Sequence, residues 1–171
     1  MNDKQFDVAI LMGSPSDLDV MSEAARVLNQ FGVSFDMEVT SAHRSPERTR
    51  HYIKQAEAHG ARVFIVGAGA AAHLAGVTAA ETTLPVIGVP LAGSALNGID
   101  ALYSTVMMPG GVPVATMAIG KAGATNAGVF AVEILALSDP ALRQKLADHK
   151  TGLARKVEEA SQEARKRLAP S

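Results

Sequence analysis

The sequence predicts a three-layer α/β/α domain built on a doubly wound parallel β-sheet. Short apolar runs of strand length alternate along the chain with segments of helical periodicity, which is typical of repeated βα units. Most of these runs are apolar at nearly every position, as expected for parallel strands that helices cover on both faces. With 171 residues, of which 47% are hydrophobic, the chain is long enough for one globular domain with a sizeable core.

Five apolar runs are expected to form the strands, and capping and stop residues mark the helices between them. The runs are residues 8–12, 35–39, 63–66, 86–89 and 114–118. Ser16 is expected to cap a helix over 17–30, and Gly32 stands just beyond its end. A Ser-Pro pair begins a second helix over 45–59, which Gly60 ends. Further helices are expected over 72–82, 98–107 and 126–137.

The chain changes character from Pro140 onward, where charged residues are interspersed among leucine and valine. This pattern predicts one or two amphipathic helices over about 140–168. The tail either presents a solvated face that closes the domain or also packs on another subunit. We expect a single domain over 1–171, with its core over about 6–138 and a C-terminal helical extension.

The composition argues against several classes of partner and site. Sixteen basic and seventeen acidic residues leave a formal net charge of -1, so no overall field draws the protein toward nucleic acid or membrane. The absence of cysteine excludes disulfides, thiolate chemistry and cysteine-containing metal sites. The N-terminus lacks a signal pattern and no apolar run is long enough to span a bilayer, so a cytoplasmic protein is the expectation.

The loops that follow the first three runs are the candidate site. In an open parallel sheet, ligands bind beyond the carboxyl ends of the strands, so these loops are expected to converge on one rim. They are residues 13–17, 41–46 and 67–74.

The first of these loops suits a phosphate. Ser14 and Ser16 offer hydroxyls, and the helix N-terminus offers free backbone N–H groups that favour an anion. Asp17 can instead bind ribose hydroxyls. The same residues are also ordinary turn-and-cap chemistry, and they lack the Gly-Lys-Ser/Thr ending of a P-loop.

The second loop places His43 and Arg44 side by side immediately before a helix. A guanidinium can hold a phosphate or carboxylate, while an imidazole transfers protons near neutral pH. A lone loop histidine is commonly just a partly exposed residue, but the strand-end position favours a function for His43. His51 and His59, within or at the end of a helix, are interpreted as structural.

The third loop has almost no side chains between Gly67 and Ala72, so a planar ligand can approach the backbone N–H groups closely. Tight helix–sheet packing is the alternative explanation. The match to a dinucleotide-binding fingerprint is poor, because the segment follows the third strand and lacks the acidic partner. His73 either orients this loop or touches the ligand.

Two further stretches each allow more than one interpretation. Residues 108–114 lead into the last strand and can line a site or a subunit contact, and Lys121 can meet an anion or simply lie on the surface. No cluster of His, Asp or Glu has metal-ligand spacing, and no nucleophile-elbow sequence is present.

Taken in order, five motifs resemble those of the N5-carboxyaminoimidazole ribonucleotide mutase (PurE) family, and the resemblance extends to about residue 148. The motifs are Gly-Ser-Pro-Ser-Asp at 13–17, Ser-Ala-His-Arg at 41–44, Gly-Ala-Gly-Ala-Ala-Ala-His-Leu at 67–74, Met-Pro-Gly-Gly-Val-Pro-Val at 108–114, and Gly-Lys-Ala-Gly at 120–123. The resemblance implies a flavodoxin-like fold and a homo-octamer. It also implies conversion of N5-carboxyaminoimidazole ribonucleotide into 4-carboxy-5-aminoimidazole ribonucleotide without metal, ATP or bound coenzyme.

The resemblance also implies roles for the candidate residues. His43 would be the general acid and base, and Ser41 would contact the nucleotide. The backbone around the migrating carboxylate would include Gly69, Ala70 and Ala71. By the same resemblance, ribose and phosphate would be held by Ser14, Asp17 and Arg44, and His73 would sit beside the pocket.

The chain also departs from the family pattern, which commonly reads Gly-Gly-Ala-Ala-His-Leu-Pro-Gly in the third loop. Here Ala70 and Ala75 replace a glycine and the proline, which leaves the geometry and closure of the loop open. Two alternative functions remain: an aminoimidazole ribonucleotide carboxylase that uses free carbon dioxide, and a non-enzymatic flavin- or nucleotide-binding module. Arg44, where the carboxylase branch typically has lysine, and the Pro-Gly-Gly-Val-Pro stretch favour the mutase.

Overall fold

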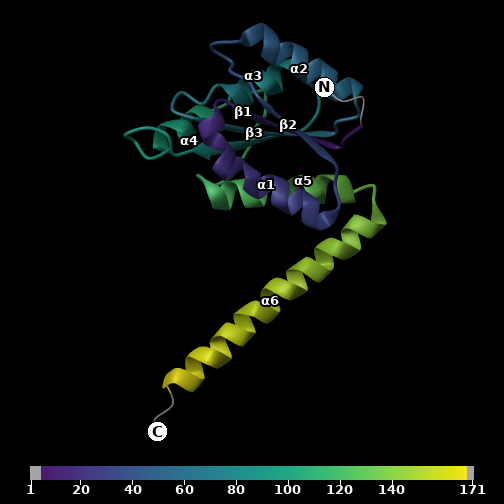
Figure 1. The fold of residues 1–171 in the computed structure, drawn as a ribbon, viewed down its shortest axis with the longest axis vertical. Helices are drawn as coiled ribbons and strands as arrows, with labels where there is room; N and C mark the ends of the chain where they lie inside the picture. Colours follow the sequence, from purple (N-terminus) through teal and green to yellow (C-terminus); the bar gives the residue numbers. More distant parts are fainter. Residues whose placement is uncertain (1–4, 169–171) are drawn as a thin grey trace.

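A five-stranded parallel sheet forms the centre of the computed structural model, which describes residues 5–168 (Figure 1). The strands are β1 (Val8–Met12), β2 (Phe35–Val39), β3 (Val63–Gly69), β4 (Val86–Leu91) and β5 (Ala115–Thr116). Their order is β2-β1-β3-β4-β5, and every neighbouring pair is parallel. This is the flavodoxin-like order of a doubly wound sheet, so the predicted fold class is confirmed.

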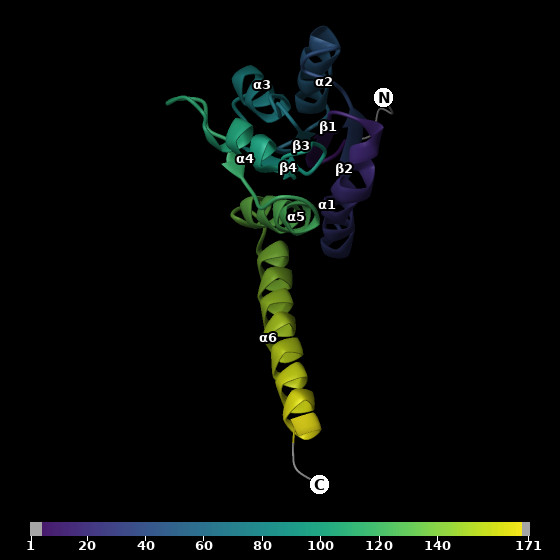
Figure 2. The same cartoon turned by 90° about the vertical axis from the view of Figure 1, so that its left-hand side faces the viewer.

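Helices cover both faces of the sheet (Figure 2). They are α1 (Leu18–Phe31), α2 (Pro46–Ala58), α3 (Leu74–Glu81), α4 (Ile99–Val106), α5 (Lys121–Ala136) and α6 (Pro140–Leu168), with a 3-10 turn, η1 (Pro15–Asp17), before α1. One layer of the core joins the sheet to α1 and α5, and the other joins it to α2, α3 and α4.

The alternation of side chains along β1 shows how one strand serves both layers. Ile10 and Met12 pack toward α1 and α5, while Ala9 and Leu11 pack toward α2 and α3. Every residue of β1 is buried, which explains its continuous apolar run. The edge strand β2 is only half-buried, and it correspondingly carries two carboxylates.

The start of α1 differs from the prediction: the N-cap of α1 is Asp17, which makes no side-chain cap, and Ser14 rather than Ser16 caps the η1 turn before it. Ser14 Oγ accepts a hydrogen bond from the Ser16 amide, and Asp17 Oδ2 accepts one from the Ser14 amide at 3.0 Å. This reciprocal pair forms a capping box over η1. Proline at the first position tightens the entry into a 3-10 turn, which moves the cap two residues upstream of its predicted place.

Other elements also differ in extent from the prediction. Strands β3 and β4 run on to Gly69 and Leu91, three and two residues beyond the predicted runs. Helix α5 begins at Lys121 rather than at residue 126, and β5 covers only Ala115–Thr116 rather than 114–118. Small residues conceal the start of α5 because alanine and glycine give weak periodicity. Those same residues let α5 lie close to α1: a Cβ added to Gly128 would stand 2.8 Å from Val27 Cβ. The extent of α5 therefore follows from packing rather than from an apolar stripe.

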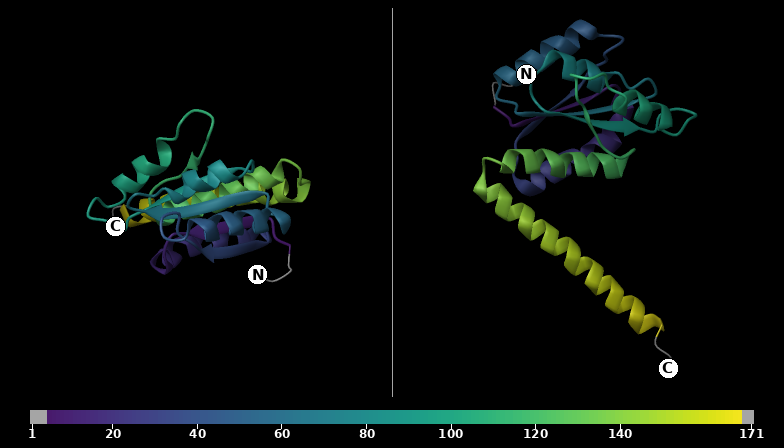
Figure 3. Two further views of the ribbon diagram at one scale, coloured as in Figure 1. Left: turned by 90° about the horizontal axis from the view of Figure 1, so that it is seen from above. Right: turned by 180° about the vertical axis from the view of Figure 1, so that it is seen from behind.

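Helix α6 is one continuous helix of 29 residues that projects away from the domain (Figures 1 and 3). Gly152 does not interrupt it. Leu146 is its one buried residue in the described part of the chain. The N-terminal end of α6 packs beneath α5, and its distal half extends into solvent.

Candidate active site

The three predicted loops meet beyond the carboxyl ends of the strands, around an open cavity of about 410 Å³. Ten residues were predicted for the site, and all of them except Ala71 line this cavity; the Ala71 side chain is exposed to solvent. The lining residues are Gly13, Ser14, Ser16, Asp17, Ser41, Ala42, His43, Arg44, Ala68, Gly69, Ala70, Ala72, His73, Leu74 and Gly93. The topology thus brings together three loops that lie far apart in the sequence, as the strand-end rule predicts.

Gly93 belongs to the loop after β4, which sequence reasoning did not single out. The same strand-end rule applies to that loop and could have found it. Gly69, at the end of β3, lies close to it: a Cβ added to Gly69 would stand 3.3 Å from the Leu91 carbonyl oxygen. A side chain at this position would crowd the Leu91 carbonyl oxygen, so glycine suits the end of β3.

The first loop presents a partly buried carboxylate. Burial raises the pKa of Asp17, and hydrogen bonds from Ser14, Ser16 and Gly13 oppose this effect. Ser16 Oγ donates to Ser14 Oγ at 2.9 Å, so the two hydroxyls stay together at the rim. The loop therefore offers hydroxyls and a carboxylate oxygen side by side, which suits the hydroxyl and phosphate groups of a sugar phosphate.

Arg44 connects the second loop to the first. Its guanidinium donates to the Gly13 carbonyl oxygen at 3.3 Å, and its own amide donates to Ser41 Oγ at 3.2 Å. The side chain is exposed, so other guanidinium N–H groups can face a ligand in the cavity. A cation held at the junction of two loops is well placed to bind an anionic group.

His43 and His73 contact each other across the cavity. His43 Nε2 and His73 Nδ1 are 2.7 Å apart, and the two rings are nearly perpendicular, at 72°. One of these nitrogens must donate and the other accept, because two protonated rings would direct N–H groups at each other. Both rings are exposed, so the ring nitrogens outside this contact are accessible to a ligand.

The third loop turns through a strained residue. Ala70 has φ of 52°, in the left-handed region where a side chain is unfavourable. The Ala72 amide donates to the Gly69 carbonyl oxygen at 3.1 Å, which closes the turn around Ala70. The loop thereby presents backbone and methyl groups to the cavity and carries no ionised side chain before His73.

The remaining candidate residues lie elsewhere. Lys121 pairs with Asp19 at 2.9 Å at the start of α5. His59 Nδ1 lies 2.6 Å from the Gln55 carbonyl oxygen and its ring stacks on Phe6, while His51 is exposed on α2. Residues 108–114 do not line the cavity. Within residues 5–168, no three His, Cys, Asp or Glu side chains are grouped so that they could hold a metal ion.

Comparisons with known proteins agree on one family. The family described as AIR carboxylase matches residues 7–156. A curated N5-carboxyaminoimidazole ribonucleotide mutase of Pyrococcus horikoshii is 53% identical over 152 residues, covering 89% of this chain and 85% of that protein. The protein of the same name from Bacillus subtilis is 51% identical over 154 residues, covering 90% and 95%.

Solved structures agree with this match. A crystal structure of Treponema denticola PurE superimposes with a TM-score of 0.82 at 27% identity, covering 91% of this chain and 96% of that one. The structure of a single-substitution variant of Treponema denticola PurE2 gives a TM-score of 0.85 at 26% identity, covering 93% and 98%.

In the part of the chain that the structure describes, no helix is both long and apolar enough to cross a membrane.

Proposed function

This chain belongs to the AIR carboxylase family, and we propose that it is an N5-carboxyaminoimidazole ribonucleotide mutase of purine biosynthesis. It converts N5-carboxyaminoimidazole ribonucleotide into 4-carboxy-5-aminoimidazole ribonucleotide. One observation of the structure supports this reaction above all: a single cavity combines the His43 imidazole, the Arg44 guanidinium and a methyl-lined loop. Such a cavity can bind a ribonucleotide, transfer a proton and retain a small apolar molecule.

His43 performs both proton transfers in the proposed mechanism. As an acid it protonates the carbamate nitrogen, so that the bond from this nitrogen to the carboxyl carbon breaks and carbon dioxide is released. The imidazole ring carbon of the substrate then adds to carbon dioxide. His43, now a base, removes the proton from that carbon and restores aromaticity. The proton donated in the first step is recovered in the last, and the net reaction is an isomerisation.

We propose that the first two loops hold the ribose and phosphate. Arg44 and the hydroxyls of Ser14 and Ser16 bind the phosphate, and Asp17 accepts hydrogen bonds from ribose hydroxyls. Ser41 contacts the nucleotide near His43. The exposure of the Arg44 guanidinium and its contact with Gly13 support this arrangement, because the cation bridges the two loops where they meet.

The third loop retains carbon dioxide in this proposal. Gly69, Ala70 and Ala72 supply backbone and methyl groups around the migrating carboxylate, and His73 stands beside them. Charged side chains at this position would tether the carboxylate where it starts, whereas a weakly polar surface lets it move. The lack of a side chain at Gly69 supports this arrangement, because it leaves room for a ligand at the end of β3.

The reaction is tested by supplying purified protein with each ribonucleotide, with and without bicarbonate. The mutase forms 4-carboxy-5-aminoimidazole ribonucleotide from the N5-carboxy substrate when bicarbonate is absent. Product that arises only from aminoimidazole ribonucleotide and bicarbonate would contradict the proposal and indicate a carboxylase. A protein that is yellow as isolated and inactive with both substrates would indicate a flavin-binding module.

We propose that the protein is a homo-octamer of single catalytic domains in the cytoplasm. An exposed apolar face on and beside α4 supports self-association, because apolar patches of this kind commonly mark protein interfaces. The residues of this face are Leu96, Ile99, Tyr103, Val106 and Met107, with exposed fractions of 47 to 78%. Light scattering should give the mass of eight chains, and Tyr103→Glu should give a smaller assembly. A monomeric unmodified protein would contradict the octamer.

A further inference from the structure

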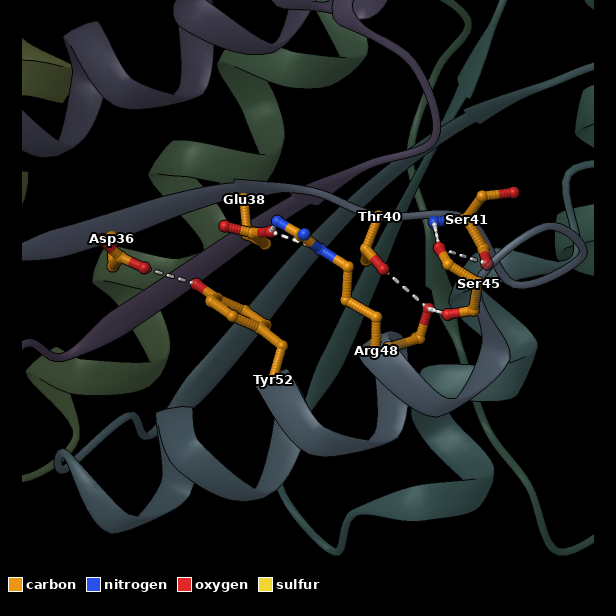
Figure 4. Close-up of polar contacts among 8 residues, drawn as sticks. Asp36, Glu38, Thr40, Ser41, Ser45, Arg48 and Tyr52 are labelled. Atoms are coloured by element: carbon orange, nitrogen blue, oxygen red, sulfur yellow. Dashed lines mark hydrogen bonds and ion pairs between the residues drawn. The ribbon is translucent and has the colours of Figure 1, made fainter. Parts of the chain in front are cut away.

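Helix α2 is joined to the edge strand β2 by a ladder of three polar contacts (Figure 4). Alternate residues at β2 and just beyond it point to the same side, where residues of α2 meet them. The pairs are Asp36 with Tyr52 at 2.8 Å, Glu38 with Arg48 Nε at 3.0 Å, and Thr40 with Thr49 at 2.8 Å. Because the loop from Ser41 to Ser45 connects these two elements, the ladder sets the separation of its two ends.

The threonine contact differs from the other two in burial. Thr40 is 3% exposed and Thr49 is 0% exposed, so water cannot replace a lost partner. Thr49 Oγ1 donates to the Ser45 carbonyl oxygen at 3.2 Å. When the Thr49 hydroxyl donates to Ser45, Thr40 is the donor to Thr49, because a hydroxyl has one hydrogen. The two hydroxyls thus link the end of β2 to the backbone of the loop, where the Thr49 amide also donates to the Ser45 carbonyl oxygen.

The chain of hydrogen bonds continues through the loop. Ser45 Oγ donates to the Ser41 carbonyl oxygen at 3.2 Å and accepts from the Ser41 amide at 3.1 Å. Ser41 Oγ in turn accepts from the Arg44 amide at 3.2 Å. His43 therefore lies between residues whose backbones are fixed on both sides, and the outermost support of this arrangement is the buried threonine pair.

We propose that Thr40 and Thr49 are positioning residues, which fix the Ser41–Ser45 loop and thereby aim His43 and Arg44 at the substrate. The proposal rests on the proposed function for the identity of the reaction. Its physical basis is that a buried hydroxyl without a partner is costly, so the chain of bonds favours one loop geometry. A small displacement of a proton-transferring group is enough to slow a reaction substantially.

The kinetic test is Thr49→Val, which removes the hydroxyl and keeps the shape of the side chain. We expect kcat of the mutase reaction to fall by roughly tenfold, because His43 is no longer held in place. The KM should change less, since flexible Arg44 can still reach an anion. Thr49→Ser restores the hydroxyl and should recover kcat to within about twofold.

Two further variants separate positioning from stability. Tyr52→Phe removes the ladder contact farthest from the loop and should leave kcat unchanged. The double variant Thr40→Val/Thr49→Val leaves no buried hydroxyl unpaired, so its melting temperature should exceed that of Thr49→Val. Its kcat should nevertheless stay low, because the Ser45 carbonyl still lacks the hydroxyl donor. A wild-type kcat in either Thr49→Val or the double variant would overturn the proposal.

Hydrogen exchange supplies a measurement that does not depend on activity. In Thr49→Val, the amides of Ser41, Arg44 and Ser45 should exchange faster than in the unmodified protein, while Tyr52→Phe should not change them. Unchanged exchange at all three amides would overturn the positioning role. If the unmodified chain lacks mutase activity, the proposed function fails, and these exchange rates still decide whether the threonine pair fixes the loop.

Discussion

The contact between His43 and His73 concentrates the candidate chemistry in a single pair of side chains. His43 Nε2 and His73 Nδ1 lie 2.7 Å apart, so each ring orients the other. His43 is adjacent to Arg44 in sequence, whereas His73 comes from a loop thirty residues away. Their proximity follows from the parallel order of β1, β2 and β3.

Replacement of His43 tests its role directly. His43→Asn should leave folding and nucleotide binding nearly intact and reduce turnover by at least about 100-fold, because the acid and base of both steps are lost. Turnover and calorimetric binding of the ribonucleotide measure the two effects. His51→Asn, on the exposed side of α2, is the matched control and should be fully active. Near-normal turnover in His43→Asn would contradict the mechanism.

The backbone conformation of Ala70 predicts that replacement by glycine stabilises the protein. Its φ of 52° is unfavourable for alanine and comfortable for glycine. Ala70→Gly should therefore raise the free energy of unfolding by about 1 kcal/mol, as measured by denaturant unfolding. Ala71→Gly is the matched control, since Ala71 has no such backbone strain and should lose a little stability instead. Equal losses in both variants would refute this account.

Asp17 predicts a dependence of stability on pH. Burial raises its pKa in the folded protein above the ordinary value of 3.8, so the native state binds more protons in the window above that value. The contribution of Asp17 to the stability of the folded protein is therefore lost as the pH rises from 3.8 through the raised pKa. Asp17→Asn should be more stable than the parent at pH 7, and the advantage should shrink as pH falls to 3.8 and below. A difference in stability between Asp17→Asn and the parent protein that stays constant across this pH range would contradict the prediction.

At the scale of elements, α5 packs closely on α1, and both helices cover the same face of the sheet. Gly128 stands where a Cβ would be 2.8 Å from Val27 Cβ and 3.0 Å from the Ala24 carbonyl oxygen. Gly152 in α6, in contrast, has nothing within 4 Å of an added Cβ. Each glycine lies inside a helix, but Gly128 is packed against a neighbouring helix and Gly152 is not.

The same substitution at these two glycines should have opposite effects on stability. Gly128→Ala should destabilise the protein by about 1–3 kcal/mol, because the packed helices must move apart. Gly152→Ala should stabilise α6 by up to about 1 kcal/mol, since alanine is the better helix former and meets no neighbour. Thermal unfolding measures the first change and helix content by circular dichroism the second. Destabilisation by both would show that α6 is packed more closely than described.

The whole molecule consists of a compact α/β body and the helix α6, which projects from it. The match to the family ends at residue 156, and the described part of α6 beyond that point buries no side chain. Truncation after Lys156 should therefore leave turnover and the melting temperature unchanged. Leu146→Ala, which alters the buried foot of α6, is the contrasting variant and should cost about 2–5 kcal/mol. Loss of turnover on truncation would show that the distal helix supports the site.

Much of the site was predictable because its loops follow buried strands. The runs at 8–12 and 35–39 matched β1 and β2 to the residue, and the strand-end rule then placed nine of the ten predicted residues around one cavity. Ala71 does not line the cavity, because a tight turn at Ala70 leaves the Ala71 side chain exposed to solvent. Gly93 was missed because glycine has no side chain that could suggest a role, so only its position after β4 indicates it.

The sequence by itself determined the α/β class and singled out the loops that line the cavity, with His43 and Arg44 as candidates, because apolar periodicity and local motifs are properties of short segments. Only the tertiary structure decided that Ser14 rather than Ser16 caps the turn before α1, that α5 begins at Lys121, and that two buried threonines support the His43 loop. These features depend on distances between residues far apart in the chain or on the detailed backbone path, and neither is encoded in the pattern of a single segment.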